Sequence, residues 1–208
     1  MISLIEIKNK LMEGFRHALP GENAHELMSV PGRGRYPIVP ENAKKAAVLV
    51  FLYPKVDRVF ITLIKRETHD KDRHSGQISF PGGSMEATDD YPIQTAIREA
   101  HEEIGIPTEI EVLGTLSSLY IPVSGFYVSP VVAIHHTPII FTVQASEVKE
   151  ILEVDLAMLI RSGSKSKRDI KINSGFLLKE VPCYEIHGTI VWGATAMILS
   201  ELEWLITK

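Results

Sequence analysis

FPGGSMEATDDYPIQTAIREAHEEIGI, residues 80–106, joins a glycine turn to an acidic helix, and the interpretation of the whole chain depends on it. Its second half carries apolar residues at the three- and four-residue steps of a helix: Ile93, Ala96, Ile97, Ala100 and Ile104. This period predicts a helix over residues 92–104 with one apolar stripe facing a core. Pro92 suits the first turn, and Gly105 can end the helix in a left-handed conformation. Capping oxygens are available just before the helix, on Thr88, Asp89 and Asp90.

Three carboxylates share one edge of this predicted helix. At roughly 100° per residue, Glu99, Glu102 and Glu103 fall within an arc of about 100° beside the apolar stripe. Like charges at these spacings repel, so a hard, oxygen-seeking cation such as Mg²⁺ or Mn²⁺ would explain their proximity. For an isolated ExxEE pattern, a solvated acidic face is the commoner explanation. The neighbouring Gly82–Gly83 turn, where a backbone can approach a ligand closely, favours the cation site.

Residues 98–106 read REAHEEIGI, and together with the glycine turn they resemble the box of the Nudix hydrolases. That box is a glycine, five residues, Glu, seven residues, then REUxEExGU, in which U is aliphatic. Ala100 stands at the first U, where a small apolar residue suits the buried stripe. The first half departs from the pattern, because Asp89 instead of Glu follows the five residues after Gly83, and counting seven residues back from the arginine reaches Asp90. This one-residue insertion with Asp resembles the coenzyme A pyrophosphatase branch of the family.

Three further stretches resemble the same branch. They are HSGQISFPGG at residues 74–83, LSSLYIPVSGFYVSPVV at 116–132 and IVWGATA at 190–196. The resemblance extends over about residues 36–206. It implies an α/β chain with the Nudix fold, a three-layer α/β/α sandwich with a mixed β-sheet. We therefore expect a single domain over residues 1–208, in which residues 1–35 add an N-terminal helix and connector to the core at 36–206.

The resemblance also implies an activity and assigns roles to residues. The activity is metal-dependent hydrolysis of a pyrophosphate bond, most specifically in coenzyme A or acyl-coenzyme A, giving 3′,5′-ADP and (acyl-)phosphopantetheine. Glu99 and Glu103 would be the main ligands of Mg²⁺ or Mn²⁺, and Glu102 a third ligand or the group that accepts the proton of water. Arg98 would orient the carboxylates. The catalytic set would thus be Glu102, Glu103 and Arg98, with the ion neutralising phosphate oxygens and activating water.

Substrate contacts are expected at the glycine turn and in the segment before it. Gly82 and Gly83 would shape the turn over the carboxylates, and His74 and Gln77 are candidate substrate contacts or, equally well, an internally hydrogen-bonded loop. Farther along the chain, Glu147, Glu150 and Glu153 are interpreted as surface carboxylates, with an extra ligand or base as the alternative. The basic run at residues 165–171 is interpreted as a solvated loop, with phosphate contact as the alternative.

Two rival functions remain at this level. A related enzyme could cleave another nucleoside diphosphate derivative such as ADP-ribose, because the box defines the bond that is cut and not the group attached to it. A non-catalytic binding or regulatory module with the Nudix fold is the second rival, and it would not need the full acidic set. The presence of Glu99, Glu102 and Glu103 together favours an enzyme.

Composition narrows the setting. A chain of 208 residues with 45% hydrophobic content is long enough for a sizeable core. Its net charge of −4 argues against a nucleic-acid partner, but a local basic pocket could still bind an anionic nucleotide. The single cysteine, Cys183, excludes an intrachain disulfide, and the sequence offers neither a signal sequence nor an apolar run of membrane-spanning length. We expect a cytoplasmic protein with a small-molecule partner and no membrane partner, and a homodimer is possible.

The remaining elements follow from hydrophobic period and turn residues. Strands are expected at residues 46–53, 58–65, 109–121 and 125–134, and a hairpin that turns near His187 and Gly188 at residues 183–193. Residues 146–160 are interpreted as a strand followed by a short helix. An amphipathic helix is expected over residues 2–18, packing on the domain or on a second subunit, and another over residues 194–206. Between the first helix and the first strand, the proline- and glycine-rich residues 20–41 are expected to form an extended connector.

Overall fold

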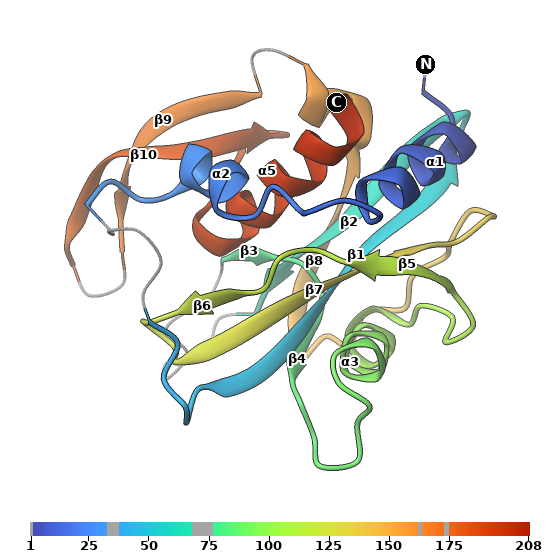
Figure 1. Ribbon diagram of the computed structural model, residues 1–208, viewed down its shortest axis with the longest axis horizontal. Coiled ribbons are helices and arrows are strands. Elements are labelled where there is room, and N and C mark those ends of the chain that lie inside the picture. The colour runs from blue at the N-terminus through green and yellow to red at the C-terminus, as the bar shows by residue number, and fades with distance from the viewer. Residues whose placement is uncertain (1, 33–37, 68–76, 162–163, 173–174) are drawn as a thin grey trace.

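The computed structural model describes residues 2–32, 38–67, 77–161, 164–172 and 175–208 (Figure 1). A mixed β-sheet forms its middle layer. The strands of this sheet are β1 (Lys44–Lys55), β2 (Arg58–Arg66), β3 (Ile78–Ser79), β4 (Gly82–Ser84), β5 (Glu111–Thr115), β6 (Leu119–Ile121), β7 (Phe126–Ile134) and β8 (Val148–Asp155). Strand β1 is central, because it pairs in parallel with β7 and antiparallel with both β2 and β4. The predicted hairpin of β1 and β2 is confirmed.

Helices cover both faces of this sheet, so the predicted three-layer α/β/α arrangement is confirmed. Helix α3 (Ile93–Ile104) lies on one face (Figure 1). Helices α1 (Leu4–Gly14), α2 (Glu22–His25) and α5 (Gly193–Thr207) lie on the other. Consecutive residues of β1 point to opposite faces, and both faces are buried, which explains the nearly continuous apolar run in this strand.

The packing of α3 follows from its small residues. Ala96 and Ala100 are fully buried against the Ala47, Leu49 and Phe51 side of β1. Alanine lets the helix axis approach the sheet closely, which brings the polar edge of the helix within reach of β4. Gly105 ends the helix in the left-handed conformation, as predicted, with φ of 67°. The predicted stripe is wrong at one position, since Ile93 in the first turn is 41% exposed.

The N-terminal segment packs on the same domain. Helix α1 begins at a capping box formed by Ser3 and Glu6, and its Ile7 and Leu11 are fully buried in the core that α5 shares. The expected extended connector is wrong over residues 22–28, which form α2 and the 3₁₀ helix η1 (Glu26–Met28). Tertiary contacts override the local sequence there, because the imidazole of His25 is buried against α5.

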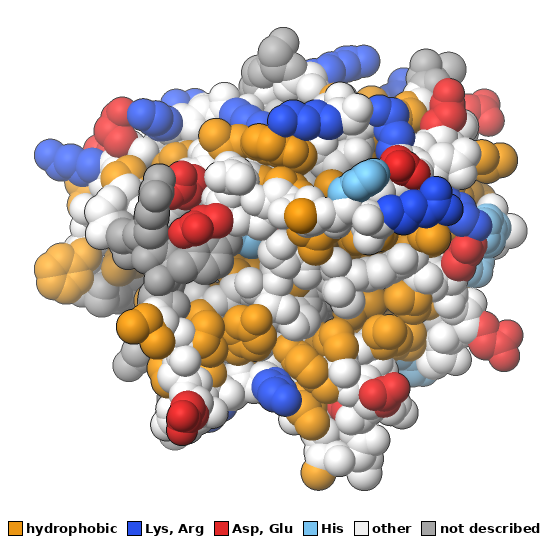
Figure 2. All heavy atoms as spheres, in the orientation of Figure 1, with side chains coloured by type: hydrophobic (Ala, Val, Ile, Leu, Met, Phe, Trp, Pro, Cys, Tyr) orange, Lys and Arg blue, Asp and Glu red, His pale blue; other side chains and the backbone are white. Residues whose placement is uncertain are grey.

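A second, three-stranded sheet follows α4 (Leu156–Ile160). Its strands are β9 (Lys165–Lys171), β10 (Leu177–Ile186) and β11 (Thr189–Trp192). The expectation of a solvated loop at residues 165–171 is therefore wrong. Basic residues can lie in strand β9 because acidic residues of the neighbouring strand β10 offset their charge. Arg168 pairs with Glu185, and Lys167 pairs with Glu180. Figure 2 likewise shows acidic and basic side chains interspersed over one face of the molecule.

Helix α5 differs from the expected amphipathic helix. Its residues from Thr195 to Leu202 are all buried, because the sheet covers one side and the N-terminal segment covers another. Such a helix is apolar on most of its circumference. Among the described residues, no helix combines the length and hydrophobicity that crossing a membrane requires.

Candidate active site

Two adjacent glycines, Gly82 and Gly83, allow β4 to contact its neighbours closely. At each position a side chain would cause a different steric clash. Gly82 pairs with Val48 and adopts φ of 148°. A Cβ atom there would lie 2.4 Å from the backbone oxygen of Ala47, so only glycine allows β4 to approach β1. At Gly83 a Cβ atom would lie 2.3 Å from Oε2 of Glu99. The predicted glycine turn thus lies directly against the acidic edge of the helix.

Glu103 is the buried member of the acidic edge, and its carboxylate faces the glycine turn. It is 1% exposed, and its Oε2 accepts the backbone N–H of Gly82 at 2.8 Å. Nη1 of Arg66, at the end of β2, lies 3.5 Å from Oε1. Burial raises the pKa of Glu103 to about 7, because these contacts only partly offset desolvation and because the charges of Glu99 and Glu147 add to it. A bound cation would stabilise the ionised form.

Glu99 lies beside Glu103 in a half-buried position. Burial raises the pKa of Glu99, against the opposing charge and hydrogen bond of Arg98, and nearby Glu102 and Glu147 raise it further. Glu147 comes directly before β8 and so brings a carboxylate from a different element to the same place. Of the carboxylates at residues 147–153, Glu153 has a separate structural role, because it accepts the Tyr53 hydroxyl at 2.6 Å.

Arg98 is the hub of the polar contacts around the carboxylates. Its guanidinium donates to Asp89 at 2.9 and 3.1 Å, to Glu99 at 3.0 Å, to the backbone oxygen of Ser84 at 3.1 Å and to Glu102 at 3.3 Å. These bonds join the loop after β4 to the helix and hold the Glu99 carboxylate from the side. The role of orienting the carboxylates, which the resemblance implies for this arginine, stays a prediction that these contacts support.

Asp89, and not Asp90, is the acid that completes this network. Besides Arg98, it accepts the Thr95 hydroxyl at 3.0 Å and the Glu86 N–H at 2.9 Å. The Arg98 hydrogen bond holds the pKa of Asp89 well below its usual range. Asp90 is exposed, and its side chain has no hydrogen-bond partner among the described residues. The expected capping of α3 is wrong, because no side chain caps its first turn and Asp89 binds Arg98 instead.

Comparisons with known proteins identify the family of this chain. Residues 43–159 match the family model of the NUDIX domain. The chain belongs to the Nudix hydrolase family. It is 35% identical over 162 residues to a protein of Enterobacter sp. (strain 638) named "Uncharacterized Nudix hydrolase NudL", a match that covers 77% of this chain and 82% of the relative. A relative of the same name from Salmonella paratyphi B is 36% identical over 164 residues, with the same coverage.

Solved structures agree on the Nudix fold. The MutT protein of Methanosarcina mazei Go1 superposes with a TM-score of 0.51 at 14% identity, covering 79% of this chain and 96% of that one. A MutT/nudix family protein of Enterococcus faecalis gives a TM-score of 0.50 at 19% identity, covering 97% of this chain and 73% of that one. Nudix hydrolases act on nucleoside diphosphate derivatives and generally use divalent metal ions.

The carboxylates of this Nudix hydrolase fit a hard divalent ion. Among the described residues, no three His, Cys, Asp or Glu side chains form a ready-made cage for a metal. Mg²⁺ does not need one, because it usually keeps several waters and takes one or two carboxylates plus substrate phosphates. Glu99 and Glu103 supply two carboxylates in a partly desolvated place, and the missing Cβ of Gly83 lets the Glu99 carboxylate approach the turn closely. Glu102 accepts from the same Arg98 nitrogen as Glu99, but its side chain is 56% exposed.

The predicted substrate contacts remain predictions. His74 lies outside the described residues, and Gln77 immediately precedes β3, where its backbone oxygen accepts the N–H of Arg66 at 3.1 Å. This bond places the Gln77 segment next to the strand end that carries Arg66, near Glu103.

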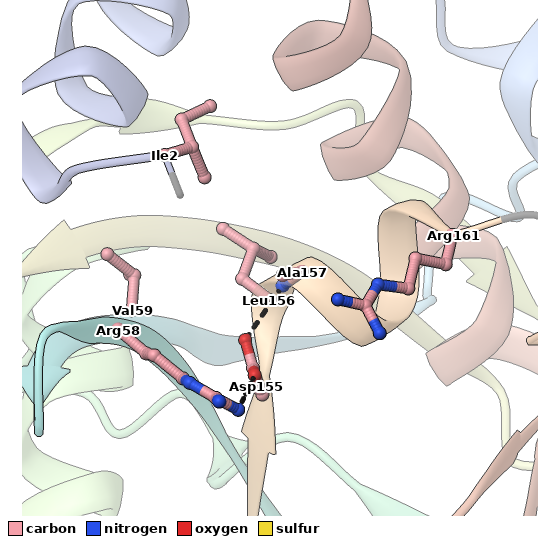
Figure 3. A pocket seen from close by; sticks show the side chains of 7 residues that line it. All are labelled: Ile2, Arg58, Val59, Asp155, Leu156, Ala157 and Arg161. Carbon is pink, nitrogen blue, oxygen red and sulfur yellow. Dashed lines mark hydrogen bonds and ion pairs between the residues drawn. The ribbon is translucent and has the colours of Figure 1, made fainter.

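A hollow of about 80 Å³ lies elsewhere in the Nudix fold (Figure 3). Its lining residues are Ile2, Arg58, Val59, Asp155, Leu156, Ala157 and Arg161. It lies at the start of β2 and the end of β8, whereas Arg66 and Glu147 lie at the opposite ends of these antiparallel strands. In the hollow, Asp155 binds Arg58 at 3.0 Å and caps α4 through the N–H of Ala157 at 2.9 Å. The hollow is therefore separate from the carboxylate site.

Proposed function

We propose that this Nudix hydrolase cleaves the pyrophosphate bond of coenzyme A or acyl-coenzyme A, giving 3′,5′-ADP and (acyl-)phosphopantetheine. The observation that carries the hydrolytic part is the pair of desolvated carboxylates, Glu99 and Glu103, held against the Gly82–Gly83 turn. The charges of Glu99 and Glu147 both act on Glu103 and raise its pKa. Such a place suits a divalent cation that meets a diphosphate, because the ion offsets charge on both sides.

The contacts of each residue suggest its role in the reaction. Mg²⁺ or Mn²⁺, when bound, would neutralise phosphate oxygens and lower the pKa of a water molecule. Glu99 and Glu103 would hold the ion, and Arg98 keeps Glu99 in place through the bond at 3.0 Å. Glu102 is exposed beside Arg98 and is our first candidate for a third ligand or proton acceptor. Glu147, whose charge raises the pKa of both Glu99 and Glu103, is the second candidate.

The choice of coenzyme A rests on the signature stretches, and their arrangement supports it. Thr195, in IVWGATA, donates its hydroxyl proton to the backbone oxygen of Ile78, in HSGQISFPGG, at 2.9 Å. This bond is buried and joins positions 117 residues apart in the chain. The stretch HSGQISFPGG leads directly into the glycine turn. Two stretches that resemble the coenzyme A branch are thus in contact, and one of them contains the glycine turn, which supports the choice of substrate.

Product analysis tests the proposal. Purified protein would be incubated with Mg²⁺ or Mn²⁺ and, separately, with coenzyme A, an acyl-coenzyme A and ADP-ribose, and the products separated by chromatography. We expect 3′,5′-ADP from the first two substrates and none from a Glu103→Gln control. Cleavage of ADP-ribose alone would replace the proposed substrate with the other nucleoside diphosphate derivative. Hydrolysis of none of the three would favour a binding module.

A further inference from the structure

Tyr91 precedes the carboxylate helix and ties its start to two strands of the sheet. The hydroxyl group lies 3.2 Å from the backbone oxygen of Ala46 in β1 and 2.8 Å from Oγ of Ser129 in β7. Ser129 is itself buried, and its Oγ lies 2.6 Å from Oγ of Ser118. The sequence gives Tyr91 no role in the Nudix box, and the helix period does not include it.

The direction of these hydrogen bonds follows from counting protons. A carbonyl oxygen can only accept, so the Tyr91 hydroxyl donates its one proton to Ala46. Tyr91 must then accept from Ser129, and Ser129 in turn accepts from Ser118. The chain runs from Ser118 through Ser129 and Tyr91 to Ala46, and each hydroxyl both donates and accepts except the first. Burial raises the pKa of Tyr91 above its ordinary value, so the phenol keeps the proton that this chain requires.

The first turn of helix α3 has two other side-chain ties, from the Thr95 hydroxyl to Asp89 at 3.0 Å and from the Asp90 N–H to Gln94 at 2.7 Å, but both lead to the loop before the helix. Tyr91 is the tie from this end of the helix to the sheet. No side chain caps the first turn, whereas the other end is held by Gly105 and by the bond from Gly82 to Glu103. Glu99 lies eight residues beyond Tyr91, which is about 12 Å along a helix, so a tilt at the start displaces the carboxylates. Ligand geometry must hold to within about 0.5 Å for a productive site.

We propose that Tyr91 is a positioning residue for the metal-dependent reaction, whose hydroxyl, held between Ala46 and Ser129, keeps Glu99 and Glu103 aligned with the glycine turn. This inference rests on the proposed function only where its test measures a rate of hydrolysis; measurements of metal binding and hydrogen exchange do not depend on the substrate. Tyr91→Phe is a clean perturbation, because the ring stays and Lys45 can keep its position 5.3 Å from the ring centroid. Only the oxygen atom is removed.

A matched control is available on the same strand. Tyr127 lies two residues before Ser129, on the same face of β7, and its hydroxyl has no hydrogen-bond partner among the described residues. Tyr127→Phe removes the same atom without touching the chain of hydroxyls. Ser129→Ala breaks the chain from the other side and should reproduce the effect of Tyr91→Phe. Ser118→Ala removes only the outermost link and supplies a milder variant if either of the others fails to fold.

The test combines metal binding, hydrogen exchange and kinetics. Mn²⁺ binding to each variant would be measured by electron paramagnetic resonance without substrate, and amide exchange would be followed over residues 93–104. For Tyr91→Phe we expect Mn²⁺ affinity to fall about three- to tenfold, faster exchange in this helix, and kcat about tenfold lower with KM changed less than about twofold. Tyr127→Phe should match the wild type.

Two results would overturn the inference. One is wild-type Mn²⁺ affinity and kcat in Tyr91→Phe. The other is a lowered melting temperature with unchanged Mn²⁺ binding, which would make the hydroxyl a matter of stability alone. Failure of the proposed function looks different, because wild-type protein would then hydrolyse none of the substrates while the Mn²⁺ and exchange measurements still report on Tyr91.

Discussion

Replacing Asp89 by Asn separates the two acids between which the sequence could not choose. Asp89 and Asp90 are adjacent and chemically identical, but Asp89 alone of the two accepts bonds from Arg98 in the structure. The matched pair Asp89→Asn and Asp90→Asn therefore makes the same chemical change once inside the network and once outside it. We predict a large loss of activity for the first and none for the second.

The size of the loss follows from the contacts. Oδ1 of Asp89 accepts Nε of Arg98, and Oδ2 accepts Nη2 together with the Thr95 hydroxyl and the Glu86 N–H. An amide keeps one acceptor oxygen and turns an NH₂ group toward a donor, so at least one bond to Arg98 is lost. Loss of a partner that orients a metal-ligating group costs typically about 10- to 100-fold in activity or metal affinity. We expect kcat/KM to fall within that range.

The pH dependence sharpens the prediction. Because Arg98 holds the pKa of Asp89 well below its usual range, this carboxylate stays ionised throughout any assay above pH 5. The deficit of Asp89→Asn should therefore be the same at every pH from 5 to 9, measured as initial rates at saturating Mg²⁺. Equal activities of the two variants, or a deficit that appears only at high pH, would refute this account of the network.

Three further predictions concern Glu103, Gly83 and Glu201. Glu103→Gln should lower metal-dependent turnover at least about 100-fold while circular dichroism shows an unchanged fold, and a variant of full activity would exclude this residue from the site. Gly83→Ala should displace the Glu99 carboxylate and raise the Mg²⁺ concentration needed for half-maximal rate. The melting temperature should change little, since the added Cβ atom would clash only with the end of the Glu99 side chain. An unchanged Mg²⁺ requirement would contradict this prediction. Glu201→Gln should lower the free energy of unfolding in urea by about 2–4 kcal/mol, because the carboxylate accepts bonds from Gly21, His25 and Ser117. Burial opposes ionisation of Glu201, but these bonds lower its pKa in the folded protein below the unfolded value near 4.5. The stabilisation by Glu201 is therefore present above pH 4.5 and is lost as the pH falls through the pKa of the folded state. A stability deficit of Glu201→Gln that grows in acid would contradict this prediction.

The local sequence was sufficient to predict those helices and strands whose hydrophobic residues recur at the period of the element. Residues 92–104 were predicted as a helix and form α3 from Ile93 to Ile104, because one stripe faces the sheet and a glycine ends it. Strands β1, β2 and β7 were predicted for the same reason, whereas β3 and β4 were not, and residues 109–121, expected as one strand, form β5 and β6. The largest errors occur where distant residues decide. Residues 22–28 become helical around His25, whose ring binds Glu201 at 2.9 Å, 176 residues away in sequence. Strand β9 is charged and depends on its partners in β10.

The candidate site shows the same division. The sequence placed Glu99 and Glu103 on one helix edge and brought the glycine turn near them, and the structure joins them through Gly82. It could not choose between Asp89 and Asp90, because the loop before α3 has no period that fixes where each side chain points. Tyr91 left no signal either, since its partners lie on β1 and β7.

The three glutamates of the box differ in burial for a reason that the helix itself supplies. Measured from the fully buried Ala96 at about 100° per residue, Glu103 lies about 20° away, Glu99 about 60° and Glu102 about 120°. Their side-chain exposures follow this order, at 2%, 17% and 56%. Glu103 is thus part of the apolar stripe, where ionisation is costly without a cation. A solvated acidic face would not place a carboxylate there, so the burial of Glu103 supports our proposal that this edge of α3 holds an ion.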